Sequence, residues 1–292
     1  MVDHLPNFSV SSSISLTNIV LIFGFGRVLT DDILVTDPST TVEEEELRKY
    51  GIYHSLPSLL NILRSEQFKD SPEANELYHT FVNECNYGTN QSLHVVRNKT
   101  GLWPLFVVEG VQTSGKLSAS KRIAETLMAT LLTTPPDCLY HLRSTFEKYN
   151  GTLRGVYYSL CNYALANAIL KILPHSSVIV NRYWHSQAAF ALALAEVEGY
   201  KISPLSHLYM WPEDLLVPDK VFFLQYSHSR PRNMQSVIRT MSRKFRDRMT
   251  QQFMRMRQPA LQEIFEVQLF RQVGRILKII AQEFPGFFSD IQ

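Results

Sequence analysis

The sequence predicts an α/β protein with a parallel sheet flanked by helices, and three observations favour this fold class. Short apolar runs suited to buried strands alternate with stretches of helical periodicity from about Leu102 onward. A glycine-rich loop follows the first of these runs and opens a helix. The second run ends in Asn181-Arg182, where an open α/β sheet places its ligand-binding residues. We therefore expect a P-loop α/β domain over residues 101–292, preceded by a small N-terminal α/β appendage over residues 1–100.

The N-terminal hundred residues are less regular than the rest of the chain. The apolar run Ile19–Phe23 predicts a strand. Leucines at helical spacing predict a helix around Leu56–Leu63, and Ser71-Pro72-Glu73 predicts the start of another, because proline is favoured in the first helical turn. The stretch 83–100, rich in Asn, Gly and Thr, predicts a connection to the main domain. No residues typical of catalysis are visible in this appendage.

In the main domain, apolar runs predict buried strands and longer amphipathic stretches predict helices. The predicted strands are Leu105–Val108, Val178–Val180 and Val221–Leu224. The predicted helices are Lys116–Leu132, Leu153–Leu173, Gln187–Val197, Met234–Met256 and Ala260–Phe284. The pair Pro135-Pro136 is expected to stop the first of these helices.

The strongest local motif is Gly110-Val111-Gln112-Thr113-Ser114-Gly115-Lys116, between the first predicted strand and the first predicted helix. Glycines let the backbone approach phosphate closely, N–H groups at the helix N-terminus bind phosphate oxygens, and the lysine reaches the terminal phosphates. An ordinary glycine-rich turn is the alternative interpretation. The candidates for phosphate binding are Gly110, Thr113, Ser114, Gly115, Lys116 and Ser118.

Two positions depart from the chemistry that a P-loop supplies. The residue after the lysine is Leu117, which has no hydroxyl to bind Mg²⁺, and Ser118 lies about 100° further round the helix. After the second predicted strand, Asn181 stands where an acid could organise Mg²⁺, whereas Arg182 can neutralise a transferring phosphate. An exposed charge at a strand end is the alternative for Arg182. We therefore expect phosphate binding with doubtful binding of Mg²⁺, and we assign no residue as a metal ligand.

A further group of candidates lies in and near the predicted helix 153–173. Its tyrosine rings can stack on a base, and its amide can pair with a base edge. A core helix with tyrosine edges at the surface is an equally consistent interpretation. The candidates for substrate binding are Arg154, Tyr157, Tyr158, Asn162 and Tyr183.

Composition sets loose bounds on location and partners. With 45% apolar residues, 19% charged residues and a net charge of +2, the chain resembles an ordinary globular protein. The run Ile14–Phe25 is too short to span a membrane, and one arginine in the first thirty residues gives no evident mitochondrial transit peptide. Three widely spaced cysteines predict a reducing compartment and argue against disulfides or structural zinc. The basic segment 230–257 is most simply a solvated amphipathic helix, with a phosphate-clamping lid or a nucleic-acid patch as alternatives.

Together these residues resemble the thymidylate-kinase-like family of P-loop nucleoside monophosphate kinases, over about Trp103 to Gln258. The resemblance is most specific in Arg182-Tyr183-Trp184-His185-Ser186 and in Trp211-Pro212-Glu213-Asp214-Leu215-Leu216. It also rests on shorter matches at Pro104–Gly110, Gly115-Lys116, Pro135-Pro136, Tyr157–Leu160, Asn162-Tyr163, Val178–Asn181 and Pro218-Asp219.

The resemblance implies transfer of the γ-phosphate of ATP, with Mg²⁺, to a pyrimidine nucleoside monophosphate such as UMP, CMP, dUMP, dCMP or dTMP. It implies that Lys116 and Arg182 are catalytic, and that Gly110 and Gly115 hold ATP phosphates. It implies that Arg154 and the face Tyr157–Tyr163 hold the acceptor nucleotide. It further suggests a homodimer and a mitochondrial location, with the cytoplasm as the alternative, and it gives no reason to expect nucleic acid as a partner.

The sequence departs from the family pattern where metal and phosphate chemistry are concentrated. Gln112 and Asn181 replace acids, and Leu117 replaces a hydroxyl residue. Phosphoryl transfer depends mainly on electrostatic positioning, so these changes are expected to slow it. Two functions therefore stay open, a nucleoside monophosphate kinase and a catalytically impaired relative that binds nucleotide or another protein. A weaker alternative is a polyanion binder that uses the segment 230–257.

Overall fold

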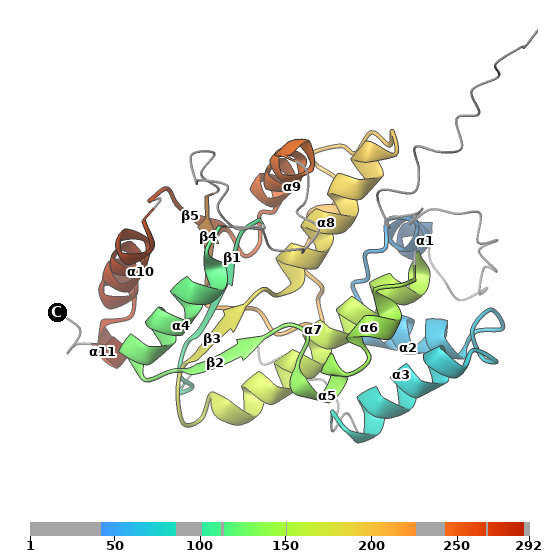
Figure 1. Cartoon of the computed structure of the whole chain (residues 1–292), viewed down its shortest axis with the longest axis horizontal. Coiled ribbons are helices and arrows are strands. Elements are labelled where there is room, and N and C mark those ends of the chain that lie inside the picture. Colours follow the sequence, from blue (N-terminus) through green and yellow to red (C-terminus); the bar gives the residue numbers. More distant parts are fainter. Residues whose placement is uncertain are drawn as a thin grey trace, which may run out of the picture.

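The computed structural model describes residues 42–85, 101–111, 114–149, 151–225, 243–266 and 268–288. Within these residues the chain folds around one parallel sheet with helices on both faces (Figure 1). The predicted strand Ile19–Phe23, the loop positions Gln112 and Thr113, and the segment 226–242 lie outside the described residues. What the sequence predicts for these parts stays a prediction.

The described part of the chain contains a five-stranded sheet with the order β2-β3-β1-β4-β5, and every neighbouring pair is parallel. In the central strand, Val108 is level with Asn181 of the strand on one side and with Phe222 of the strand on the other. The carboxyl ends of these central strands therefore meet at one edge of the sheet, and the expected α/β fold class is confirmed. The strands are β1 (Leu105–Glu109), β2 (Thr130–Thr133), β3 (Val178–Asn181), β4 (Lys220–Leu224) and β5 (Leu261–Ile264).

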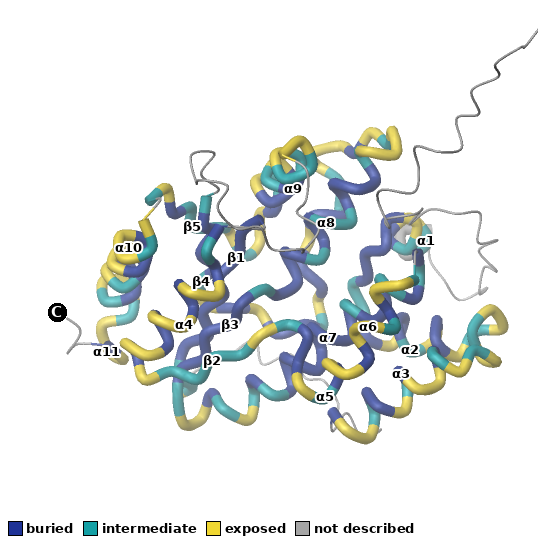
Figure 2. Tube along the Cα trace, viewed as in Figure 1, coloured by how far each residue is buried: buried dark blue, intermediate teal, exposed yellow. Residues whose placement is uncertain are grey.

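Strand side chains alternate between two hydrophobic cores, one on each face of the sheet. Phe106 and Val108 belong to the core that α4 (Lys116–Leu127) and α10 (Leu269–Glu283) cover. Leu105 and Val107 belong to the core on the other face, which α7 (Thr152–Ile172), α8 (Trp184–Val197) and α9 (Arg243–Arg255) cover. Because both faces are covered, β1, β3 and β4 are apolar along almost their whole length, and Figure 2 shows them as buried beneath partly exposed helices.

The helix predicted for Lys116–Leu132 is wrong in its C-terminal part. The helix ends at Leu127, and Met128 takes a left-handed conformation with φ 51°. Thr130–Thr133 then forms the edge strand β2, which pairs with β3. A short apolar run is compatible with either a helix or a strand, so here the available pairing partner decides.

The helix predicted for Ala260–Phe284 is wrong in its N-terminal part for the same reason. Leu261–Ile264 pairs with β4 as strand β5, and α10 begins only at Leu269. The other predicted helices that fall on described residues are present as α7, α8 and α9. Among the described helices, none combines the length with the apolar composition that a bilayer span requires. The remaining short helices of this part are α5 (Asp137–Tyr140), α6 (Arg143–Phe146), η3 (His207–Tyr209) and α11 (Pro285–Phe288).

The described part of the N-terminal appendage is helical. Ser55 and Ser71 cap the two predicted helices, and Ser71 Oγ accepts a hydrogen bond from the N–H of Ala74 at 3.3 Å. Buried side chains of all three helices belong to the same core as α7 and α8. The division at residue 100 stays a prediction about domain organisation. The helices are α1 (Val42–Lys49), α2 (Leu56–Arg64) and α3 (Pro72–Asn83).

A disulfide joins the N-terminal helices to the main domain. Cys85, directly after α3, is bonded to Cys138 in α5, and their Cα atoms are 5.5 Å apart. Cys161 in α7 is buried and free. The prediction that the cysteines form no disulfide is therefore wrong. Pairing depends on which Cα atoms the fold brings together, and a separation of 53 residues along the chain does not reveal this.

Candidate functional site

The glycine-rich loop connects β1 to α4 at the edge where the central strands end. At Gly110 φ is +146°, and a Cβ atom would lie 2.8 Å from the carbonyl oxygen of Leu224 and 2.8 Å from Ser114 Oγ. At Gly115 φ is +87°, and α4 begins at the next residue. No side chain of the described residues caps this helix, so the N–H groups of its first turn are available to an anion.

The side chain of Lys116 folds back against the loop that precedes it. Its Nζ donates a hydrogen bond to the carbonyl oxygen of Val111 at 2.8 Å and lies 3.5 Å from Ser114 Oγ. Burial and the nearby charge of Arg182 hold the pKa of Lys116 well below its ordinary value, against the opposing effect of Glu109. An anion bound in the loop would favour the charged lysine and compete with Val111 for its Nζ.

A buried carboxylate at the end of β1 organises the turn between β3 and α8. Glu109 accepts hydrogen bonds from the N–H groups of Tyr183 at 2.9 Å and Ser186 at 3.3 Å, and from the Ser186 hydroxyl. Burial raises the pKa of Glu109, while these hydrogen bonds and the charge of Arg182 oppose the rise. Sequence analysis did not select Glu109 as a site residue. The available signal was an acid at the end of an otherwise apolar, buried strand.

Arg182 lies in this turn with an unusual backbone conformation. Its φ is 72°, and a non-glycine residue in this left-handed region costs about 1 kcal/mol or more. Its N–H donates to the carbonyl oxygen of Val108 at 3.2 Å, and its own carbonyl oxygen accepts a hydrogen bond from Thr134 Oγ1 at 2.9 Å. Contacts from two neighbouring strands therefore hold the strained residue in place.

The charges around Arg182 favour an anion. Burial lowers the pKa of Arg182, and the neighbouring Arg143 acts in the same direction, whereas Glu109 opposes the shift. Two cationic side chains, the buried Lys116 and the partly buried Arg182, thus lie near the same buried carboxylate of Glu109. Since burying a charge without a partner is costly, a phosphate bound between the two cations would stabilise both of them.

A cavity of about 470 Å³ opens beside this turn and extends between α7 and α8. Leu117, the residue after the P-loop lysine, borders it, so the cavity reaches the first turn of α4. Its cationic lining residues are Arg143, Arg154 and Arg182. Its other polar and aromatic lining residues include Thr133, Thr134, Tyr140, Tyr158, Asn162, Gln187 and Phe190.

The structure separates the candidates that the sequence predicts on α7. Residues four apart project from one helical face, and three of the candidates line the cavity in this way. Tyr157 instead lies in the core, where its ring stacks on Phe146 with centroids 4.9 Å apart. Its hydroxyl donates to the carbonyl oxygen of Leu139 at 3.0 Å, and burial raises its pKa. The three that line the cavity are Arg154, Tyr158 and Asn162.

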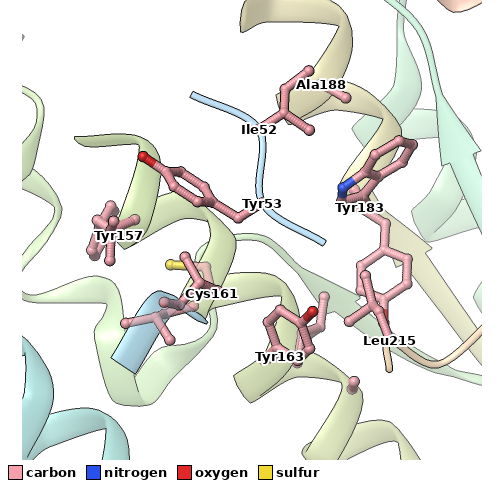
Figure 3. Packing of buried hydrophobic residues seen from close by; sticks show 14 of the residues in the cluster. Ile52, Tyr53, Tyr157, Cys161, Tyr163, Tyr183, Ala188 and Leu215 are labelled. Atoms are coloured by element: carbon pink, nitrogen blue, oxygen red, sulfur yellow. The ribbon is translucent and has the colours of Figure 1, made fainter. Parts of the chain in front are cut away.

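The remaining predicted residues differ in how close they lie to the cavity. Tyr183 borders it but is only 1% exposed, because it packs among the buried hydrophobic residues that Figure 3 shows. Its hydroxyl donates to the carbonyl oxygen of Leu216 at 3.3 Å. Ser114 is buried beneath Gly110 in the loop. Ser118 is exposed and does not border the cavity, and Thr113 lies outside the described residues.

An amide pair spans the cavity from α7 to α8. Asn162 Nδ2 donates to Gln187 Oε1 at 2.9 Å, and Gln187 Nε2 donates to the carbonyl oxygen of Gly155 at 3.2 Å and to Ser159 Oγ. The Oδ1 atom of Asn162 is buried and accepts no hydrogen bond from the described residues. A ligand N–H group is therefore the natural partner for this oxygen.

Sequence analysis missed Arg143, Gln187 and Phe190. Gln187 and Phe190 lie in the first turns of α8, directly after the predicted site residue Arg182, and this nearness was a usable signal. Arg143 had no such signal, because only the fold brings the short helix α6 to the cavity. Its Nε donates to Glu147 Oε1 at 2.8 Å, which fixes the guanidinium at the cavity rim.

The positions expected to handle metal offer few oxygen ligands. Leu117 is 46% exposed and presents an apolar side chain to the cavity. Asn181 ends β3, and its Oδ1 is buried without a hydrogen-bond partner in the described part of the chain. Within the described ranges, no three His, Cys, Asp or Glu side chains are grouped so that they could hold a metal ion.

No protein-family model matches the sequence. Over 129 residues the chain is 34% identical to UMP-CMP kinase 2, mitochondrial, of Homo sapiens, a match that covers 44% of this chain and 29% of that protein. Thymidylate kinase from Candida albicans superposes with a TM-score of 0.52 at 17% identity, covering 62% of this chain and 92% of that one. Thymidylate kinase from Ehrlichia chaffeensis gives a TM-score of 0.45 at 17% identity, covering 61% and 98%.

Proposed function

We propose, from the premise that the chain resembles the thymidylate-kinase-like family in sequence and fold, that it is a nucleoside monophosphate kinase. Its acceptor is a pyrimidine nucleoside monophosphate in the cavity between α7 and α8, and its donor is ATP on the P-loop. The observation that supports this best is that an arginine-lined cavity reaches Leu117, the residue directly after the P-loop lysine. The chain spans less than a third of the length of the human relative it matches, so the whole activity is a proposal.

The polar lining of the cavity suits both parts of such an acceptor. Arg143 and Arg182 are neighbouring cations in this lining, and planar guanidinium groups bind phosphate oxygens well. Asn162 and Gln187 offer amide groups to a base edge. Phe190 offers a ring for stacking.

Lys116 and Arg182 are the groups that would stabilise charge on the transferring phosphoryl group. Arg182 is positioned for this by the turn that Glu109 holds. Lys116 must exchange its contact with Val111 for the phosphate. In the proposed reaction an anionic phosphate oxygen of the monophosphate bonds to the γ-phosphorus of ATP, the bond from that phosphorus to the β–γ bridging oxygen breaks, and ADP leaves with the electron pair.

Mg²⁺ accompanies ATP in this class of enzymes, and the described residues do not fit a protein-held Mg²⁺. This ion prefers a nearly octahedral set of oxygen ligands with carboxylates. Leu117 offers no oxygen, Asn181 offers one neutral oxygen, and the oxygens of Glu109 already accept hydrogen bonds. We therefore assign none of the described residues as a ligand of Mg²⁺.

This misfit favours a second function, binding of nucleotide with little or no phosphoryl transfer. The cavity is lined by arginines and amides, whereas Leu117 and Asn181 stand at the positions expected to handle metal. Such a protein would act by sequestering nucleotide or by presenting a nucleotide-dependent surface to another protein.

The two functions are separated by measuring binding and turnover on the same preparation. Purified protein is incubated with ATP and Mg²⁺ plus UMP, CMP, dUMP, dCMP or dTMP in turn, and diphosphate formation is followed while calorimetry records binding. Turnover of any acceptor supports the kinase. Binding that Arg182→Ala abolishes, without turnover, supports the second function. Absence of both would reject the proposed nucleotide site.

Restoring the hydroxyl residue and the acids tests the cause of any slow turnover. The triple variant Gln112→Asp, Leu117→Thr, Asn181→Asp is expected to raise turnover by about tenfold or more, because it returns oxygen ligands to the metal position. Leu117→Val is the matched control for Leu117→Thr, since it has the same shape without the hydroxyl. Equal turnover in the Thr and Val variants would exclude a role for that oxygen.

Location and assembly follow the same resemblance. The human relative is a mitochondrial protein by name, and we propose the same compartment for this chain, with the cytoplasm as the alternative. The expected homodimer stays a prediction, which sedimentation at micromolar concentration would test.

A further inference from the structure

The stretch 51–55, between α1 and α2, enters the main domain between α7 and α8. Figure 3 shows Tyr53 pointing toward Tyr157 and Cys161 of α7, whereas Ile52 points toward Ala188 of α8. Ile52 is 1% exposed and Tyr53 is 3% exposed. The preceding Gly51 borders the cavity itself. The stretch between α1 and α2 therefore forms part of the cavity wall, through Gly51.

Gly155 of α7 allows this stretch to approach closely. A Cβ atom at Gly155 would lie 3.1 Å from Tyr53 Cε2 and 3.4 Å from the carbonyl oxygen of Gly51. Gly51 has φ +65° in the turn that ends α1, where its N–H donates to the carbonyl oxygen of Arg48 at 2.9 Å. Two glycines thus bring backbone against backbone, and such a wall has no side chain that could rotate away from a ligand.

The stretch is also fixed at its other end. The N–H of Leu56 donates to Asp214 Oδ2 at 2.7 Å, and the hydroxyl of Tyr163 donates to the other oxygen of the same carboxylate. Asp214 therefore ties the start of α2 to α7. The wall has anchors on both sides of Tyr53 and is rigid in consequence.

This wall stands beside the amide pair of Asn162 and Gln187. The carbonyl oxygen of Gly155 accepts the hydrogen bond from Gln187 that orients the pair, and Gly51 and Gly155 both line the cavity. We infer that Gly51, held in place by the buried Ile52 and Tyr53, limits the room beside this pair, so that one pyrimidine ring fits and the second ring of a purine does not. The inference rests on the proposed function and adds the N-terminal segment to it as the part that selects the base.

The test compares affinities for UMP and CMP with those for AMP and GMP, by calorimetry on the full chain. Gly155→Ala wedges a methyl group between α7 and the wall, and Asp214→Asn loosens the wall from its anchor. Gly274→Ala is the matched control, because it makes the same change in α10 on the other side of the sheet, with no atom within 4 Å of the new Cβ. Competition by inorganic phosphate reports separately on the arginines that line the cavity.

We expect the ratio of purine to pyrimidine dissociation constants to fall by about tenfold in Gly155→Ala, with Asp214→Asn changing in the same direction. Inorganic phosphate should compete equally in all variants, and Gly274→Ala should behave like the unaltered protein. A ratio unchanged in both wall variants, or equally changed in the control, would overturn the inference while leaving the proposed function intact. If the unaltered protein binds no nucleoside monophosphate, the proposed function fails first and the inference fails with it. Should Gly155→Ala not fold, Asp214→Asn decides alone.

Discussion

Removing the Cys85–Cys138 disulfide is expected to lower the free energy of unfolding by about 4 kcal/mol. The bond closes a loop of 53 residues, and the corresponding loss of entropy in the unfolded chain is about 14 cal/mol/K, or about 4 kcal/mol at 25 °C. The double variant Cys85→Ala, Cys138→Ala removes the bond without leaving a buried hydroxyl. It also frees α3 from α5, the short helix that follows cavity residue Pro135.

Urea unfolding with and without reductant measures this term directly. The unaltered protein should lose the full difference on reduction, whereas the double variant should be insensitive to reductant. Cys161→Ala is the control, because it removes a buried thiol and keeps the bond. Alkylation of the unfolded, unreduced protein should label one cysteine of the three. Three labelled cysteines, or an unfolding midpoint indifferent to reductant, would refute the pairing and the estimate together.

The remaining predictions concern the loop, the buried acid and pH. Gly110→Ala should cost about 2 kcal/mol or more and abolish ATP binding in calorimetry, because its Cβ would lie 2.8 Å from a backbone oxygen; retained binding would contradict the loop geometry. Glu109→Gln should weaken acceptor binding and destabilise the fold by about 1–3 kcal/mol, since it turns an amide N–H toward donors that hold the Arg182 turn; an unchanged melting curve would count against this role. Burial, with His207 nearby, lowers the pKa of His54 from 6.5 to about 4. Between these values the unfolded chain binds more protons, so stability should decrease by up to about 3 kcal/mol as the pH is lowered from 6.5 to about 4, and the decrease should be smaller in His54→Gln when urea unfolding of both proteins is measured across this range.

Much of the architecture and part of the candidate site follow from local sequence. The apolar strands predict their own burial, because only side chains excluded from water on both faces of a sheet are uniformly apolar. The spacing of Gly110, Gly115 and Lys116 predicts the loop, because close backbone approach restricts these positions whatever the rest of the chain does. Arg154, Tyr158 and Asn162 share a face because helical periodicity is a local property.

Long-range contacts decided the rest. β2 and β5 are strands because β3 and β4 offer them pairing partners, although their short apolar runs suit either structure. Tyr157 and Tyr158 are adjacent and alike, yet one packs in the core and the other borders the cavity, since that choice depends on what lies against each face of α7.

The residues that line the cavity also come from segments that are distant in sequence. Arg143 and Gly51 are distant in sequence from the P-loop, and no periodicity or motif connects them with it. The pairing of Cys85 with Cys138 likewise depends on where α3 packs. Sequence alone therefore determined the three central strands, the loop and the cavity-lining face of one helix, since these depend on neighbours along the chain. Tertiary structure decided which distant segments close the cavity, since that depends on how whole elements pack together.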